Sequence, residues 1–120
     1  TAKRNHGFTL MEMLIVVAII AVLVAVAIPT FSSQLHKARV ATDWANVRSY
    51  YAQLQYEFME TGEINEAYLH ELGKPGLNSF YLSGQEITLK AGSIWIAECP
   101  NGYNILYYCN EKHNGCQLVL

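Results

Sequence analysis

The stretch that decides the fold is GFTLMEMLIVVAIIAVLVAVAIPTF, residues 7–31 of a chain of 120 residues. From Met13 to Ile28 it holds sixteen consecutive residues without a polar side chain, and Glu12 stands directly before this run. A helix rises about 1.5 Å per residue, so residues 8–28 span about 30 Å, the thickness of one bilayer core. A charged side chain costs roughly 2.5–3.5 kcal/mol at mid-bilayer on insertion scales, so Glu12 needs a reason to be there.

The charges that flank the apolar run predict its orientation. Lys3 and Arg4 precede it, and no basic residue follows until Lys37. The positive-inside rule therefore predicts a cytoplasmic N-terminus, with everything after Pro29 outside. Three interpretations compete: a secretory signal peptide, since residues 25–27 read Ala-Val-Ala; a plain anchor; or a segment that spans the membrane only temporarily. A carboxylate favours the third, because only a segment that must pair with something gains from it.

Residues 3–31 resemble the class III signal of type IV prepilins and pseudopilins. A short basic leader ends in Gly7, Phe8 follows, Glu12 is the fifth residue after the glycine, and Pro29 follows the apolar run. In that family a membrane-embedded aspartyl peptidase, the prepilin peptidase, cuts after the glycine and methylates the new N-terminus.

The resemblance implies several features of this chain. Residues 1–7 are expected to be a cleaved leader, with the cut between Gly7 and Phe8 and with N-methylation of Phe8. Residues 8–30 are expected to be a transmembrane helix that becomes the core of a filament.

Cleavage after Gly7 also gives Glu12 a purpose. The new ammonium group of Phe8 lies four residues from Glu12, so both point to one side of a helix. Burying an unpaired carboxylate in an apolar filament core costs roughly several kcal/mol of free energy, and burying a paired one costs much less. Glu12 of one subunit is therefore expected to meet the Phe8 amine of another and to set the register of assembly.

Residues 31–60 predict an amphipathic helix that belongs to a globular head. Apolar residues recur at heptad spacing, and Pro29 is expected to kink or unwind the helix before them. The apolar stripe consists of Val40, Trp44, Val47, Tyr51, Leu54 and Phe58. The opposite face carries Lys37, Arg39, Asp43, Arg48, Gln53 and Glu57. Gly62 is the expected C-terminal cap.

Residues 61–120 predict the rest of the head: a connecting region and an antiparallel sheet. Short β-like runs are expected at residues 80–82, 86–90, 93–97, 103–108 and 117–120. Pro100-Asn101-Gly102 is a strong hairpin signal between two of them. The sheet can pack on the stripe of the helix, so the predicted class is α+β, a long N-terminal helix on a small antiparallel sheet, as in the type IV pilin fold.

The three cysteines predict a disulfide. Cys109 and Cys116 bracket six residues and can close the last hairpin, although pairing either of them with Cys99 stays open. Cys99, Cys109, His113 and Cys116 also form a possible zinc set, but they lack the usual C-x₂₋₄-C spacing. No metal site and no cofactor are expected.

Composition and motifs exclude several classes of function. Without Lys3 and Arg4 the chain has six basic against ten acidic residues, which argues against non-specific nucleic-acid binding, and no specific nucleic-acid partner is predicted. No catalytic motif is present, so no enzyme is predicted. The resemblance implies a structural subunit of a type IV pilus-like filament, with other copies, the membrane, prepilin peptidase and the pilus assembly machinery as partners. It implies a precursor in the inner or cytoplasmic membrane and a mature extracellular pilus.

The alternatives are a pseudopilin of a type II secretion system, the pilin of a DNA-uptake pilus, or a secreted or anchored binding domain that never polymerises. Adhesion, motility, DNA uptake and secretion all remain open as roles of the filament.

Overall fold

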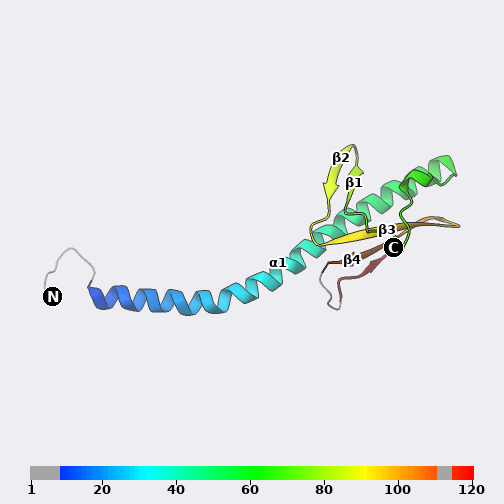
Figure 1. Ribbon diagram of the computed structural model, residues 1–120. Helices are drawn as coiled ribbons and strands as arrows, with labels where there is room; N and C mark the ends of the chain where they lie inside the picture. Colours follow the sequence, from blue (N-terminus) through cyan, green and yellow to red (C-terminus); the bar gives the residue numbers. More distant parts are fainter. Residues whose placement is uncertain (1–8, 111–114) are drawn as a thin grey trace. The chain divides into compact units, whose positions relative to one another are not determined.

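The structure is a computed structural model, and it describes residues 9–110 and 115–120 (Figure 1). The chain divides into two compact units, Thr1–Leu35 and His36–Leu120, which are considered one at a time. We call the second unit, His36–Leu120, the head.

One helix, α1, runs from Leu10 to Thr61 without a break. It passes through Pro29, although proline removes the bond to the carbonyl of Ala25. The local unwinding predicted at Pro29 is not observed. The backbone angle of proline is itself compatible with a helix, and the surrounding turns keep their bonds. The kink at Pro29 stays a prediction.

A glycine ends α1. The φ angle of Gly62 is +77°, in the left-handed region, and its N–H donates to the carbonyl of Phe58 over 2.7 Å. This single bond is the left-handed cap that glycine accepts without steric cost. The predicted C-terminal cap is confirmed.

The strands form two antiparallel sheets instead of the single sheet expected from the sequence. The first pairs β1 (Ser79–Leu82) with β2 (Gln85–Thr88), and the second has the order β3 (Gly92–Cys99), β4 (Gly102–Cys109), β5 (Leu118–Val119). A short 3₁₀ helix, Glu66–Tyr68, precedes them. The sheets stay separate because the outer edge of β3 is taken by isolated bridges from His70 to Ile96 and from Leu77 to Ile94.

Two short turns set the register of the strands. Ser83 and Gly84 join β1 to β2 with φ angles of +52° and +82°, the positive values that a two-residue type I′ hairpin requires. Pro100 and Asn101 join β3 to β4, so that Cys99 pairs with Gly102. The hairpin predicted at Pro100-Asn101-Gly102 is confirmed.

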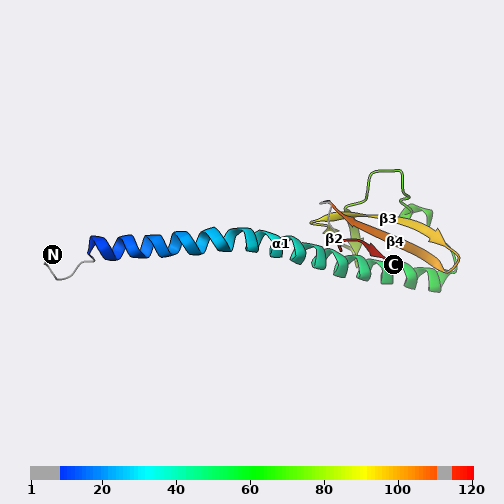
Figure 2. The ribbon, with the colours of Figure 1, turned by 90° about the horizontal axis from the view of Figure 1, so that it is seen from below.

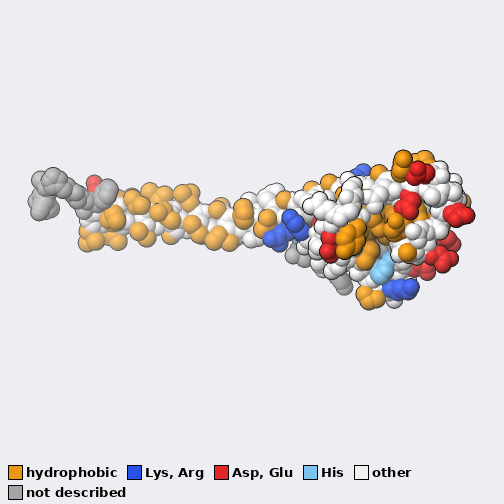
Figure 3. All heavy atoms as spheres, turned by 90° about the horizontal axis from the view of Figure 1, so that it is seen from above, with side chains coloured by type: hydrophobic (Ala, Val, Ile, Leu, Met, Phe, Trp, Pro, Cys, Tyr) orange, Lys and Arg blue, Asp and Glu red, His pale blue; other side chains and the backbone are white. Residues whose placement is uncertain are grey.

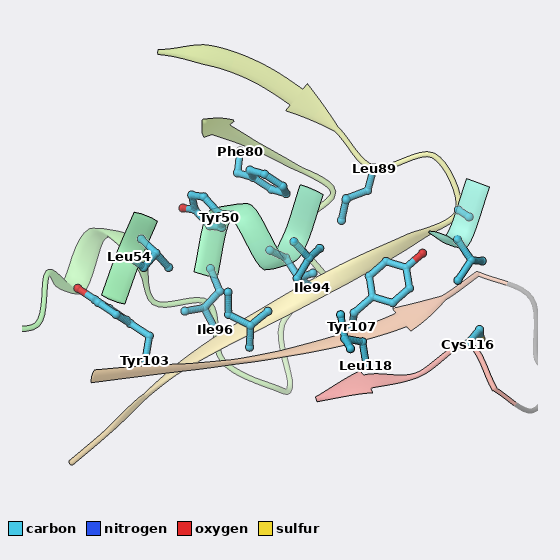
Figure 4. Close-up of a cluster of buried hydrophobic side chains, with 14 residues drawn as sticks. Tyr50, Leu54, Phe80, Leu89, Ile94, Ile96, Tyr103, Tyr107, Cys116 and Leu118 are labelled. Atoms are coloured by element: carbon cyan, nitrogen blue, oxygen red, sulfur yellow. The ribbon is translucent and has the colours of Figure 1, made fainter. Parts of the chain in front are cut away.

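Within the head, the sheet of β3 and β4 lies along the second half of α1 (Figures 1 and 2). Side chains from the helix and from both sheets meet in one core, which Figure 4 shows. Tyr103, Tyr107 and Ile94 are almost completely buried there, and Tyr50 stacks on Phe80 with ring centroids 4.3 Å apart. The predicted α+β class, a long helix packed on antiparallel strands, is confirmed.

The helix presents a slightly different face to this core from the one predicted. Its buried residues are Val40, Asp43, Val47, Tyr50 and Leu54. The stripe prediction is right at positions 40, 47 and 54, while positions 44, 51 and 58 are only partly buried and pack at the edge of the core. The axis of the face is therefore rotated toward Asp43 and Tyr50.

Asp43 is the clearest correction, because it was expected on the polar face and is fully buried. Its carboxylate accepts hydrogen bonds from the backbone N–H groups of Lys90 and Ala91 and from the hydroxyl of Tyr107, each at 2.8 Å. Three donors replace the water that burial removes, so the charged group is tolerated inside the head. Burial and the bond to Asp43 raise the pKa of Tyr107, which keeps its hydroxyl protonated.

Two glutamines of α1 hold the hairpin turns in the same way. Gln53 accepts from the N–H of Ser83 and donates to the carbonyl of Tyr81. Gln55 accepts from the N–H of Tyr103 and donates to the carbonyl of Asn101. Polar side chains of the helix therefore anchor both hairpins through main-chain atoms.

Candidate functional site

The first unit is an apolar helical surface. Every described residue from Thr9 to Leu35 is exposed, including a long series of valine, leucine and isoleucine side chains. By length and composition α1 can cross a membrane, a test that signal sequences near an N-terminus also pass. Figure 3 shows hydrophobic side chains covering this part of the helix. So much exposed apolar surface requires lipid or other protein around it.

The predicted cleavage site, Gly7 and Phe8, lies outside the described residues. Its processing and N-methylation therefore stay predictions.

Glu12 lies in the first turn of α1 and makes a reciprocal contact with Thr9. The N–H of Thr9 donates to the Glu12 carboxylate, and the N–H of Glu12 donates to the Thr9 hydroxyl, both over 3.1 Å. This is a capping box, in which two side chains satisfy the free N–H groups at a helix start. The sequence signal for it, T-x-x-E before an apolar run, was present in residues 9–12 but was not used.

The capping box gives Glu12 a structural role within its own chain, separate from any role in assembly. A carboxylate at the first turn is also favoured by the positive end of the helix dipole. A local structural role therefore exists without any second subunit. The two roles are compatible, because an ionised carboxylate has about four acceptor positions and the Thr9 N–H occupies one of them.

Pro29 lies within α1 and is exposed. Next to it, the hydroxyl of Thr30 donates to the carbonyl of Val26 over 3.3 Å. Such a bond from a threonine to the i−4 carbonyl favours a slight bend of the helix, and it goes to a different carbonyl from that of Ala25, which Pro29 cannot bond.

Cys109 and Cys116 form a disulfide, with Cα atoms 5.7 Å apart. The predicted pairing is confirmed, and Cys99 is a free, partly buried cysteine at the end of β3. Two sulfur atoms joined to each other do not ligate zinc, so the zinc alternative loses two of its four ligands. His113, the only histidine of that set, lies outside the described residues. Among the residues that are described, no group of three His, Cys, Asp or Glu side chains is placed to hold a metal.

The comparisons with known proteins agree with the N-terminal motif. Residues 2–28 match the family described as the prokaryotic N-terminal methylation motif. No solved structure matches the chain significantly.

Three curated relatives carry pilin or fimbrial names. A type IV major pilin protein of Myxococcus xanthus is 36% identical over 70 residues, which is 58% of this chain and 31% of the relative. A type IV major fimbrial protein of Dichelobacter nodosus is 29% identical over 87 residues, 72% of this chain and 56% of the relative. A type IV narrow pilus major component of Thermus thermophilus is 48% identical over 52 residues, 41% of this chain and 45% of the relative.

The matched part of each relative is thus less than two thirds of its length. The predicted resemblance to prepilins and pilins is confirmed: the chain carries the N-terminal methylation motif over residues 2–28 and is similar to proteins named as type IV major pilin and fimbrial subunits.

Proposed function

We propose that this chain is a structural subunit of a type IV pilus-like filament and not an enzyme. The observation that carries the proposal is the fully exposed apolar part of α1, residues 13–28, which begins one residue after the capping carboxylate of Glu12. The methylation motif and the similarity to major pilins support the same conclusion.

The proposed life of the protein has two stages. As a precursor it resides in the inner or cytoplasmic membrane, with residues 8–30 in the bilayer and residues 31–120 outside. Prepilin peptidase removes residues 1–7, Phe8 becomes N-methylated, and the assembly machinery lifts the subunit into an extracellular pilus. The apolar helices then cover one another in the filament core, where lipid covered them before.

In the filament, Glu12 has a second acceptor role beside the capping box. The Phe8 amine of a neighbouring copy binds the carboxylate oxygens that the Thr9 N–H leaves free. A copy out of register leaves an ammonium and a carboxylate unpaired in an apolar core, a loss of roughly 3–5 kcal/mol for a buried pair. The pair therefore selects one register.

Mass spectrometry of the mature N-terminus tests the proposal. We expect the chain to begin at N-methylated Phe8. A start at Ile28, after the Ala-Val-Ala pattern, would instead identify a secreted domain, and an unprocessed chain would identify an anchor.

A pair of variants sharpens this test. Gly7→Leu should block processing, because a peptidase that reads a small residue at the cut has no room for leucine. Gly7→Ala is the matched control and should be processed to a greater extent than Gly7→Leu. Normal maturation of Gly7→Leu would contradict a prepilin leader.

The pseudopilin and DNA-uptake alternatives share this processing, so the mature N-terminus does not separate them. Electron microscopy of the cell surface does: a type IV pilus subunit gives long surface filaments, and a pseudopilin at its native level does not. Loss of transformation without loss of surface filaments in a strain lacking the chain would favour a DNA-uptake role.

A further inference from the structure

A pocket in the head, apart from the apolar helix, has a chemistry that the filament does not explain. It is an open pocket between α1 and the β1–β2 hairpin, with a volume of about 540 Å³. Its walls include Tyr50, Gln53, Tyr56, Glu57, Glu60, Tyr68, Phe80 and Tyr81. We call it the tyrosine pocket.

Five of the twelve residues that line the pocket are aromatic. Tyr50 and Phe80 are buried and stacked, and they provide a rigid base. Tyr56 and Tyr81 are each 64% exposed, so their rings are available to a ligand. The face of such a ring carries partial negative charge and attracts cations within about 6 Å of its centre.

Two carboxylates add full negative charge to these rings. Glu57 and Glu60 are three residues apart, so they lie on one face of α1. The hydroxyl of Tyr68 donates to one oxygen of Glu57 over 2.9 Å and so orients that carboxylate. No lysine or arginine is among the residues that line the pocket, and no described residue forms a salt bridge with Glu60.

Two of the neutral polar side chains of the pocket are already engaged. Both amide atoms of Gln53 bind the main chain of the β1–β2 hairpin, and the hydroxyl of Tyr68 binds Glu57. Burial raises the pKa of Tyr50 to about 12, with a smaller contribution from its neighbours Tyr68 and Glu57. Its ring therefore remains neutral. The pocket also contains hydroxyl groups, but the charged side chains in its lining are the two carboxylates, so a cation suits it better than a neutral sugar.

We propose that the tyrosine pocket binds an organic cation, an ammonium or guanidinium group with an apolar surround. Glu57 and Glu60 neutralise the charge, while Tyr56 and Tyr81 contact its apolar surface. Two sources can supply this group: a free small cation, or a lysine or arginine side chain of a second copy. The second source rests on the proposed filament function, and the first does not.

The test uses the full chain in detergent micelles, with choline and arginine methyl ester as probes. Saturable shifts in the NMR signals of residues 50–60 and 79–84 are expected. Glu57→Gln/Glu60→Gln should weaken choline binding by at least about ten-fold, because it removes both charges but keeps side chains of the same size. Glu71→Gln/Glu98→Gln is the matched control, since it removes two exposed carboxylates outside the pocket and should leave binding unchanged.

Two uncharged probes separate a cation site from a general apolar or sugar site. The alcohol 3,3-dimethyl-1-butanol has the shape of choline without its charge and should not bind, and neither should methyl glucoside. Equal binding of choline and the alcohol, binding of the glucoside alone, or no saturable binding of either cation would overturn the proposal.

Assembled filaments distinguish the two sources. If the side chain of a second copy fills the tyrosine pocket, filaments should exclude choline although the micellar chain binds it. If the ligand is a free cation, filaments should bind choline as the micellar chain does. A chain that binds choline in micelles but never assembles would contradict the filament and leave the pocket proposal intact.

Discussion

Thr9 and Glu12 hold each other across the first turn of α1, each side chain accepting a hydrogen bond from the backbone N–H of the other at 3.1 Å. The geometry separates two properties of Glu12 that an apolar substitution would remove together. One is its ability to accept a hydrogen bond, which the capping box uses. The other is its charge, which pairing with the Phe8 amine would use.

Glu12→Gln should therefore keep the helix start and lose filaments. Glutamine serves in a capping box as glutamate does, but it cannot neutralise an ammonium group. Helicity in micelles, measured by circular dichroism, should stay at the level of the unchanged chain, while the yield of filaments seen by electron microscopy falls steeply.

The reciprocal variant is Thr9→Ala, which removes the cap and keeps the charge. It should destabilise the helix start by about 0.5–2 kcal/mol, seen as faster amide hydrogen exchange over residues 10–13, and filaments should still form. Abundant filaments from Glu12→Gln would refute the registry role of Glu12, and a loss of filaments in Thr9→Ala would show that assembly depends on the cap.

Asp43→Ala should be among the most destabilising single changes in the head. It leaves the N–H groups of Lys90 and Ala91 and the hydroxyl of Tyr107 without their acceptor, and each buried unsatisfied group costs about 1–3 kcal/mol. Urea unfolding of the chain in micelles, followed by tyrosine and tryptophan fluorescence, gives the loss directly.

Arg39→Ala is the control for Asp43→Ala, since Arg39 is exposed on the same helix and should shift the unfolding free energy by less than about 0.5 kcal/mol. Tyr107→Phe removes only one of the three donors and should cost less than Asp43→Ala. Equal stability of Asp43→Ala and Arg39→Ala would mean that the buried carboxylate does not hold the β2–β3 connection.

The raised pKa of Tyr50 predicts that the head loses stability at high pH. In the folded chain the pKa is about 12, against 10.0 for an ordinary tyrosine, because burial disfavours the phenolate. Below pH 10 both states keep the proton and the contribution is complete. Between pH 10 and about 12 only the unfolded state releases it, so the unfolding free energy falls by about 1.4 kcal/mol per pH unit for this residue.

Urea unfolding at several pH values measures this slope. Tyr50→Phe should make the fall between pH 10 and 12 shallower, while the buried Tyr107 continues to contribute in the same direction. Met59→Ala, an exposed change that alters no titratable group, is the control and should keep the original slope. A slope that Tyr50→Phe leaves unchanged would show that this phenol is not protected by folding.

The disulfide predicts a clear pattern of thiol reactivity. When oxidised protein is denatured without reductant, only Cys99 should react with an alkylating reagent, and all three cysteines should react once reductant is added. Cys109→Ser/Cys116→Ser should lower the unfolding free energy by roughly 2–3 kcal/mol, the value for so short a loop. Mass spectrometry of the peptides identifies the pair, and recovery of Cys99 in a bridge would contradict this connectivity.

The sequence was informative wherever a local signal acted alone. The apolar run, the glycine after α1 and the Pro100-Asn101-Gly102 turn each depend on nearby residues, and the helix, its cap and the hairpin followed from them. The Cys109–Cys116 pair could be favoured for the same reason, because the two residues bracket one short loop.

The residues that were misplaced depend on distant partners. From the sequence, Asp43 is expected at the surface. It is buried because the N–H groups of residues 90 and 91, which lie 47 and 48 positions further along the chain, bind its carboxylate. Tyr50 is buried because Phe80 stacks on it. Both shift the buried face of the helix, and periodicity within the helix contains no information about either. The tyrosine pocket was missed likewise, since its walls come from segments far apart in the chain.

The separation into two sheets has the same origin. The path of residues 70–77 decides what pairs with the outer edge of β3. Along that edge these residues form only isolated bridges. A list of strands does not contain that path.

Apart from the bond between Asp43 and the Tyr107 hydroxyl, Asp43, Gln53 and Gln55 bind the rest of the head through peptide N–H and C=O groups. Nearly every amino acid offers these same groups, so the side chains at positions 81, 90 and 101 can be exchanged without touching the bonds that anchor their loops. The side chains at these three positions can therefore change while three helix residues keep the same frame. New surface properties could arise there by single substitutions, with little effect on whether the subunit folds.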